Sequence, residues 1–422
     1  MHKSIVHRSM LFPFLAAFTG TGLFAAPVHE LGMGIRSKGL SRSMTALASD
    51  QSAAYWNPGG LAFMKQRELF AGIGYIGQTN EIDVDGPAGT DDIMRLRFSP
   101  AGIVLPVPVA RGGLAVSFTF CNPFVFDDIL TYSHSYRNGG GLVFTNRDFS
   151  TYGSLNYWTA AGALQLAHGL GLGVSFSMIT GNEDTRFRFF RSVDGVVSDS
   201  IDNNFEDHYK RDYIGFDFRT GLLYRPLENL RIGLRVAAPR VANFDESVKS
   251  FIPDKDGRVA FDYDTSGALH SSLEGALGGA YTINPVTVAV DLRGRVPYQV
   301  LRPNDEIPDN SSASTVKFGA GGGIELPLVI EPLKIRAGYA FDEYDSHRFA
   351  VQYEDDDTPD WRAAPATADP DINSIGVGIS FDAAEFGVDA GYNVRFWKLI
   401  TSGNVEEMHV LHDGAISLQW RF

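Results

Sequence analysis

Residues 386–396 read FGVDAGYNVRF, and every second residue of this stretch is apolar. The apolar positions are 386, 388, 390, 392, 394 and 396, while the positions between them hold glycine, aspartate, asparagine or arginine. A period of two residues is that of a β-strand with one apolar and one polar face. The stretch therefore predicts a strand whose two faces lie in different surroundings.

The same alternation recurs along the chain and predicts fourteen strands. We expect them at residues 67–78, 93–105, 112–121, 152–166, 170–190, 208–225, 230–246, 268–283, 286–298, 312–326, 331–344, 372–382, 385–399 and 409–422. The connections alternate between long ones of 9–30 residues and short ones of 2–6. An even strand number with short turns at one end and long loops at the other is typical of an outer-membrane barrel. We therefore predict an all-β, 14-stranded antiparallel up-and-down transmembrane β-barrel over residues 66–422.

Composition excludes several classes of protein. The chain of 422 residues carries 36 basic and 50 acidic side chains, with no basic block that would neutralise nucleic-acid phosphates. A single cysteine excludes an intramolecular disulfide framework and a cysteine-rich metal site. The sequence holds no Gly-x-Ser-x-Gly, His-Glu-x-x-His or P-loop motif. We predict neither an enzyme nor a cofactor, and no metal site.

The two ends of the chain indicate an exported barrel. Lys3 and Arg8 precede an apolar run at 10–18 and small residues at 20–26, which predicts a signal peptide over residues 1–25. No later apolar run reaches the roughly 20 residues of a spanning helix. The last strand ends in Ile416, Leu418, Trp420 and Phe422, a pattern similar to the signature that the bacterial barrel-assembly machinery reads. We expect the protein in the bacterial outer membrane.

Fourteen strands enclose more space than side chains alone fill, so either something else occupies the lumen or it conducts water. Residues 26–65 precede the first strand, are rich in small residues and lack a period of two. A turn is expected at Asn57-Pro58-Gly59-Gly60. We predict that this segment forms a hatch, or plug, inside the lumen.

The plug segment also carries a family resemblance. Ala48-Ser-Asp50-Gln-Ser52-Ala53, followed by Tyr55-Trp-Asn57-Pro58-Gly59-Gly60-Leu61, resembles the hatch motif of the FadL/TodX family of outer-membrane transporters for hydrophobic compounds, including long-chain fatty acids. Gly59 stands where the family usually has alanine, and Gln51 where a second aspartate is frequent. The resemblance implies a hatch or gating role for Asp50, Asn57, Pro58, Gly59 and Gly60. PorV-like secretion barrels share a similar motif, so it does not fix the cargo.

The resemblance further implies a hydrophobic pocket and a kinked third strand that opens a lateral route into the membrane. The third predicted strand runs into Asn122-Pro123, which forms either this kink or only the start of a long loop. A fatty-acid carboxylate would need a cation, for which Arg95 and Arg97 are candidates unless they only form ion pairs in the lumen. Apolar residues of the following loop either form the ligand pocket or pack on each other: Phe124, Phe126, Ile129, Leu130 and Phe144.

The function that these features predict is passive uptake of hydrophobic compounds, long-chain fatty acids or aromatic hydrocarbons, through a plugged barrel with a lateral exit. Its expected partners are hydrophobic small molecules, outer-membrane lipid and lipopolysaccharide. The acidic loop at 342–371 is either solvated or a divalent-cation site beside lipopolysaccharide. The alternatives are a secretion-system partner or adhesin that acts through its extracellular loops, and general diffusion of polar solutes past a loose plug.

Overall fold

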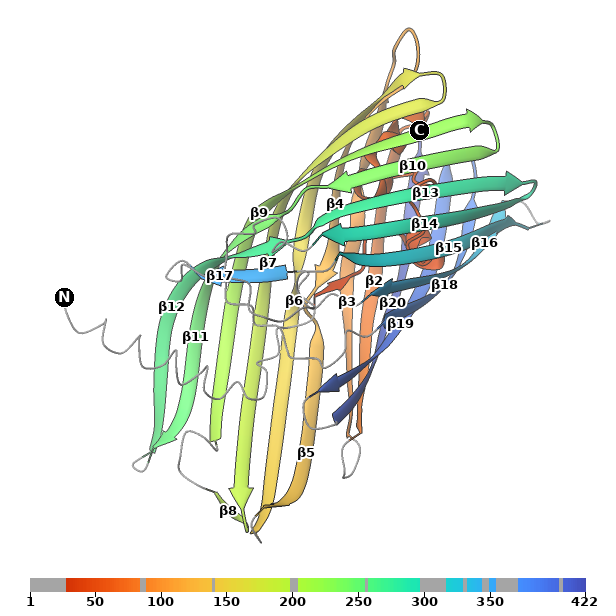
Figure 1. Cartoon of the computed structure of the whole chain (residues 1–422). Helices are drawn as coiled ribbons and strands as arrows, with labels where there is room; N and C mark the ends of the chain where they lie inside the picture. Colours follow the sequence, from red (N-terminus) through yellow and green to blue (C-terminus); the bar gives the residue numbers. More distant parts are fainter. Residues whose placement is uncertain are drawn as a thin grey trace, which may run out of the picture.

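The computed structural model describes residues 28–83, 89–138, 141–197, 204–254, 257–296, 316–328, 332–343, 349–353, 371–401 and 405–422. In these residues, fourteen strands form a closed antiparallel barrel (Figure 1). They are β2 (Glu68–Asp83), β3 (Gly89–Val107), β4 (Leu114–Val125), β6 (Gly141–Ala167), β7 (Leu170–Val193), β9 (Asn204–Leu227), β10 (Leu230–Ala237), β13 (Leu273–Ile283), β14 (Val286–Val296), β15 (Lys317–Pro327), β16 (Leu333–Glu343), β18 (Asp371–Asp382), β19 (Phe386–Thr401) and β20 (Val405–Arg421). Because β2 pairs with both β3 and β20, the sheet closes on itself. The predicted fold class is confirmed.

The outer face of the barrel is apolar. Large side chains that point outward are exposed on every side of the wall, among them Ile73, Phe118, Phe216, Leu292 and Leu418. Their neighbours along each strand point inward and are buried, as the period of two requires. An apolar belt around a barrel is what a lipid bilayer solvates. No helix in the described part of the chain is long and apolar enough to span a membrane.

Several strands continue far beyond the length that a membrane requires. A spanning strand needs about 9–11 residues, whereas β6 has 27 residues and β7 and β9 have 24 each. They extend, with further strands, into a tall wall that reaches the bottom of Figure 1. These further strands are β5 (Asp128–Asn138), β8 (Val196–Val197), β11 (Val241–Asp254), β12 (Gly257–Ser271) and β17 (Phe349–Tyr353).

The tall wall corrects three expectations. The predicted strand 230–246 is two strands, β10 and β11, which pair one after the other with β9. The chain breaks at Pro239, which has no amide proton to donate to a ladder. The predicted strand 268–283 likewise changes from β12 to β13 at Ser272. The expected 30-residue loop after residue 121 contains β5 and the first part of β6, paired with each other. Apolar and polar residues alternate in the same way in β10 and β11, and in β12 and β13, so the alternation cannot reveal where one strand ends and the next, with a different neighbour, begins.

Residues 28–64, called the N-terminal segment below, lie inside the barrel. They contain β1 (His29–Glu30), two short helices, α2 (Ile35–Gly39) and α3 (Ala53–Trp56), and the 3-10 helix η1 (Pro58–Phe63). The segment touches the wall at inward-facing glycines, where no side chain intervenes: Gly171, Gly173, Gly221, Gly233, Gly278, Gly321, Gly323, Gly338, Gly376 and Gly391. These belong to eight strands around the ring, so the segment occupies the lumen. The predicted signal peptide lies outside the described residues.

Charged side chains fix the segment to the wall. Arg36 donates to Glu325 of β15 at 2.9 Å, and the Lys38 amine donates to Asp413 of β20 at 2.6 Å. Arg42 pairs with Asp342 of β16. The Thr45 amide donates to Asp291 of β14 at 2.9 Å. Because these anchors lie on four different strands, they hold the segment in one position and orientation.

Candidate functional site

The Asn57-Pro58 turn joins the N-terminal segment to itself and to the wall. The side-chain amide of Asn57 is fully buried and donates to the carbonyls of Thr45, at 2.7 Å, and Leu222, at 2.9 Å. Its side-chain oxygen accepts from the Gly59 amide at 3.2 Å. Pro58 begins η1, a position where the missing amide proton costs nothing. Asn57 thus satisfies three backbone groups of the segment and the wall.

Both glycines after Pro58 are needed because the backbone passes so close to its neighbours. A methyl group on Gly59 would lie 2.7 Å from the Gly221 carbonyl oxygen in the wall. A methyl group on Gly60 would collide with the Ala48 carbonyl. The tight approach to the wall explains glycine at 59, where the family motif usually has alanine. Asp50, the other residue of the motif, accepts from the Ser52 amide at 2.9 Å and pairs with Arg36 at 3.1 Å.

The third strand does not end at Asn122-Pro123. β4 continues to Val125, and its register against β6 shifts by one residue between Cys121 and Phe124, which is a β-bulge. On its other side, the ladder with β3 stops at the pair Ala101–Phe120. Beyond this pair, β3 stays with β2 and β4 stays with β6. In the described residues no register pair joins the two strands there, so the wall is split.

The N-terminal segment covers the split from inside. β1 pairs antiparallel with the part of β4 that β3 has left, with His29 opposite Val125 and Glu30 opposite Phe124. The Leu31 amide then donates to the Pro123 carbonyl at 2.8 Å. These bonds satisfy the edge of β4 that would otherwise lack a partner.

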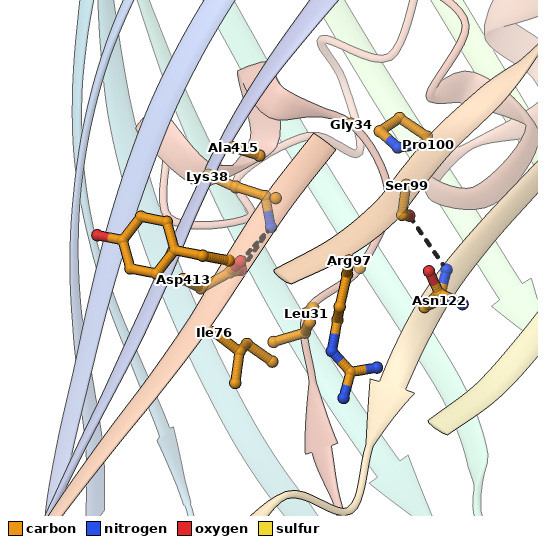
Figure 2. A pocket seen from close by; sticks show the side chains of 13 residues that line it. Leu31, Gly34, Lys38, Ile76, Arg97, Ser99, Pro100, Asn122, Asp413 and Ala415 are labelled. Carbon is orange, nitrogen blue, oxygen red and sulfur yellow. Dashed lines mark hydrogen bonds and ion pairs between the residues drawn. The ribbon is translucent and has the colours of Figure 1, made fainter. Parts of the chain in front are cut away.

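A narrow pocket lies at the split (Figure 2). Ser99 and Pro100 of β3 and Asn122 of β4 form its sides, and the backbone amide of Asn122 donates to the Ser99 hydroxyl at 3.2 Å. Arg97 of β3 also lines it, and the rest of the lining comes from β2, β20 and the N-terminal segment and includes Leu31, Gly34, Lys38, Ile76 and Asp413. The pocket therefore touches the wall, its split and the segment that covers it.

Arg95 and Arg97 share one partner. Both guanidinium groups pair with the carboxylate of Asp127, which is fully buried, and Arg95 does so at 3.3 Å. Arg95 also lies over the Tyr152 ring, 4.4 Å from its centroid. A ligand carboxylate would have to compete with Asp127 for these two cations.

The predicted apolar residues are only partly brought together. Phe124, Phe126 and Leu130 are buried, and Ile129 is half-buried. Phe126 stacks on Tyr213 with ring centroids 5.6 Å apart, and Phe124 lies 5.9 Å from Tyr157. The structure does not bring Phe144 to this group, because its side chain is 36% exposed and lies against Phe190.

No protein-family model matches the chain, and no curated protein sequence matches it. Solved structures do. A Pseudomonas aeruginosa FadL homologue has a TM-score of 0.64 and 13% identity, with 95% of this chain and 100% of the other covered. The Pseudomonas putida toluene transporter TodX has a TM-score of 0.66 and 13% identity over 93% and 99% of the two chains. The Ralstonia pickettii toluene transporter TbuX has a TM-score of 0.57 and 14% identity, with 93% of this chain and 98% of the other covered. The chain has the FadL/TodX fold.

Within this fold, the tall wall carries an aromatic surface that was not predicted from the sequence. Phe187, Phe189 and Phe205 cluster on its inner face, with Phe205 5.5 Å and 5.7 Å from the other two rings. Further along, Tyr213 lies 5.7 Å from Phe244 and meets Phe126. We call these six residues the aromatic track. The sequence does contain a signal for this surface. In β7 the alternation of apolar and polar residues continues through residues 182–190, past the length that a spanning strand needs.

Proposed function

We propose that the protein is an outer-membrane channel for passive uptake of hydrophobic compounds, with a lateral exit between β3 and β4. The observation that carries this proposal is the split wall, covered from inside by residues 29–32 and lined by a pocket. Elsewhere an apolar molecule could leave the lumen only by breaking a ladder of backbone hydrogen bonds. At the split no ladder joins β3 to β4, and only the short pairing of residues 29–32 with β4 has to be released.

Entry is proposed along the aromatic track. Short turns face the periplasm in barrels of this kind, so the tall wall stands on the outer side. Its inner face offers Phe187, Phe189 and Phe205 first and then Tyr213, Phe244 and Phe126. Beyond Phe126 the buried rings of Phe124 and Tyr157 continue toward β1 and the split. Between the two groups of rings the inner face carries the paired charges of Arg211, Glu183 and Glu246. An apolar cargo moving this way meets aromatic surface at both ends of the route, where contact with the rings removes it from water.

The gate in this proposal is the N-terminal segment. Asp50, Asn57, Pro58, Gly59 and Gly60 hold the end of the segment close to the wall, so its other end, at β1, is the part that can move. Release of residues 29–32 from β4 would connect the lumen with the pocket at Ser99, Pro100 and Asn122. The kink residues Asn122 and Pro123 shape the β4 side of this opening.

The cargo class is proposed as long-chain fatty acids or aromatic hydrocarbons. The similar solved structures include proteins named as toluene transporters and as a monoaromatic hydrocarbon channel. For a fatty acid, the proposed ligand-binding role of Arg95 and Arg97 requires exchange of their shared partner Asp127. An aromatic hydrocarbon makes no such demand, and it matches the rings of Phe124, Phe126 and the aromatic track.

Partners are proposed on the outer surface. The exposed apolar belt is suited to outer-membrane lipid, and the tall wall stands at the level of lipopolysaccharide. Trp420 and Phe422 are both exposed at the end of the last strand, with ring centroids 5.1 Å apart. This placement supports the proposal that the barrel-assembly machinery reads Phe422.

The test is uptake of radiolabelled toluene and oleate by liposomes that contain the purified protein. We expect faster entry of at least one compound than into empty liposomes, without conductance for polar solutes. If neither compound enters faster than into empty liposomes, the proposal is contradicted. Co-purification of a stable outer-membrane protein would then favour the secretion-partner or adhesin alternative.

A further inference from the structure

Three aromatic rings lie together on the lipid-facing side of the split. Phe98 of β3 and Phe120 of β4 stack across it, with centroids 6.4 Å apart and planes tilted by 23°. Trp158 of β6 lies 4.6 Å from Phe120, and its indole nitrogen donates to the Thr180 hydroxyl at 3.2 Å. Phe98 and Trp158 are 57% and 52% exposed. The trio therefore forms the outer rim of the opening.

The two sides of this rim are held by different strands. Phe98 pairs in register with Ile73 of β2, and Phe120 pairs with Trp158 of β6. The last pair that joins β3 to β4 is Ala101–Phe120, and Phe98 lies beyond it. Phe98 has no register partner on β4 in the described residues, whereas Phe120 stays paired with Ala101 at the end of the ladder. The two rings can therefore separate by rotation of their side chains, without loss of a backbone hydrogen bond.

We infer that Phe98 and Phe120 form an aromatic slot that selects planar aromatic hydrocarbons as they leave through the split. This inference rests on the proposed function and names the class of cargo that its exit prefers. The slot lies outside the lumen, at the boundary with lipid, and is separate from the pocket inside the wall. Trp158, tethered to Thr180, holds Phe120 in place from behind.

The physical reason for the preference is the quadrupole of the rings. A planar ring that enters between Phe98 and Phe120 replaces one aromatic contact by two, each with a favourable offset or edge arrangement. A saturated ring of the same size fills the same space but lacks this electrostatic component. The component corresponds to about a two- to tenfold difference in rate at the slot. Apolar burial is common to both molecules and cancels in their ratio.

The experiment compares uptake of toluene with uptake of methylcyclohexane, its saturated counterpart, in liposomes. We expect the wild-type protein to prefer toluene and expect F98L and F120L to lose about two- to tenfold of that preference. Phe98→Tyr, which keeps an aromatic ring at this position, should retain the wild-type preference for toluene. The matched control is Phe118→Leu, since Phe118 is equally exposed at 57% on the same face of β4 but lies one outward position further from the split. Unchanged preference in F98L and F120L, or an equal loss in F118L, would overturn the inference.

A second measurement separates failure of the slot from failure of the proposed function. Crystals of the protein and of F98L are soaked with bromobenzene, and the bromine is located by anomalous scattering. The inference expects a bromine peak between positions 98 and 120 in the wild-type crystal and none in F98L, even if neither hydrocarbon is taken up. Absence of the peak from both crystals would contradict the slot, whatever the uptake rates are.

Discussion

Two seams of the barrel differ in a way that the proposed uptake requires. At the closing seam, β2 and β20 pair without interruption from Glu68–Arg421 to Asp83–Glu406. At the other edge of the same hairpin, β3 and β4 pair only from Val107–Leu114 to Ala101–Phe120 and then part. Both seams lie next to β2–β3 and face the same lipid. The split is therefore a property of β3 and β4 and not of this side of the barrel.

The difference has a local cause in each strand. Ser99-Pro100 lies in β3 where its register with β2 shifts, and Asn122-Pro123 lies in β4 where its register with β6 shifts. Each proline removes an amide donor at the place where the two strands would have continued to pair. The closing seam has no proline in either strand. The N-terminal segment provides the missing pairing at the split and makes no strand pairing at the closing seam.

The largest expected effect comes from expelling the segment that covers the split. A side chain at Gly338 of β16 would collide with the backbone of Leu40. Gly338→Val should displace the segment and convert a closed barrel into an open one, with steady conductance in planar bilayers at least about tenfold above the wild-type protein. Gly279→Val is the control, because a side chain at Gly279 meets open space. Equal, low conductance in both variants would show that the segment does not close the lumen.

A smaller effect is expected from removing one anchor. Lys38→Met leaves the buried Asp413 carboxylate with Arg395, 3.9 Å away, as its remaining ion-pair partner in the described part of the chain, and breaking a buried pair costs about 3 kcal/mol or more. Hydrogen exchange of the amides at 35–47 should accelerate about a hundredfold, and Lys38→Met combined with Asp413→Leu should recover most of the protection. Lys398→Met is the control, because its pair with Glu406 is about half exposed and contributes less than about 1 kcal/mol. Similar acceleration in both single variants would argue against an anchoring role for Lys38.

Acid should loosen β1 at the split. Burial, together with the nearby positive charge of Arg395 and the neighbouring His409, lowers the pKa of His29 from 6.5 to about 3. Between pH 6.5 and about pH 3, His29 binds a proton in the released segment but not in the docked segment, where it is buried. Docking therefore weakens as the pH falls below about 6.5, by at most about tenfold per pH unit. Bilayer conductance should rise from pH 7 to pH 5 in the wild-type protein and stay flat in His29→Asn. The same rise in both would rule out His29 as the cause.

The sequence predicted the barrel well because its evidence is periodic. Each strand shows its own alternation, and the parity of long and short connections survives errors of a few residues at any boundary. The same regularity hid the changes of partner at Pro239 and Ser272, since β10 and β11 read as one alternating run. A period of two reports which face is buried and not which neighbour is paired.

Less of the site could be predicted. The turn at Asn57 was predicted from a motif. An irregularity at Pro123 was predicted from the chemistry of proline, but the sequence left open whether it is a kink or the start of a long loop. The split needs a second irregularity at Pro100, more than twenty residues away, and nothing local links the two prolines. Asp127 could not be foreseen as the shared partner of Arg95 and Arg97, because the pairing depends on how β4 leaves β3. Phe144 was grouped with Phe124 by proximity in sequence, whereas β5 and β6 place them far apart.

The most direct test of the account is a cross-link across the split. In a Cys121→Ser background, Ser99→Cys and Asn122→Cys would join β3 to β4 where the backbone amide of Asn122 now donates to the Ser99 hydroxyl at 3.2 Å. The control pair, Ile73→Cys and Ile416→Cys, joins register partners at the closing seam. Both pairs are oxidised, the cross-links are verified by mass spectrometry, and uptake of toluene into liposomes is measured.

The account predicts that oxidation lowers uptake several-fold in the Ser99/Asn122 variant, that a reductant restores it, and that the control pair has no effect in either state. Undiminished uptake through a barrel whose split is verified to be cross-linked would contradict the lateral exit and require another route out of the lumen.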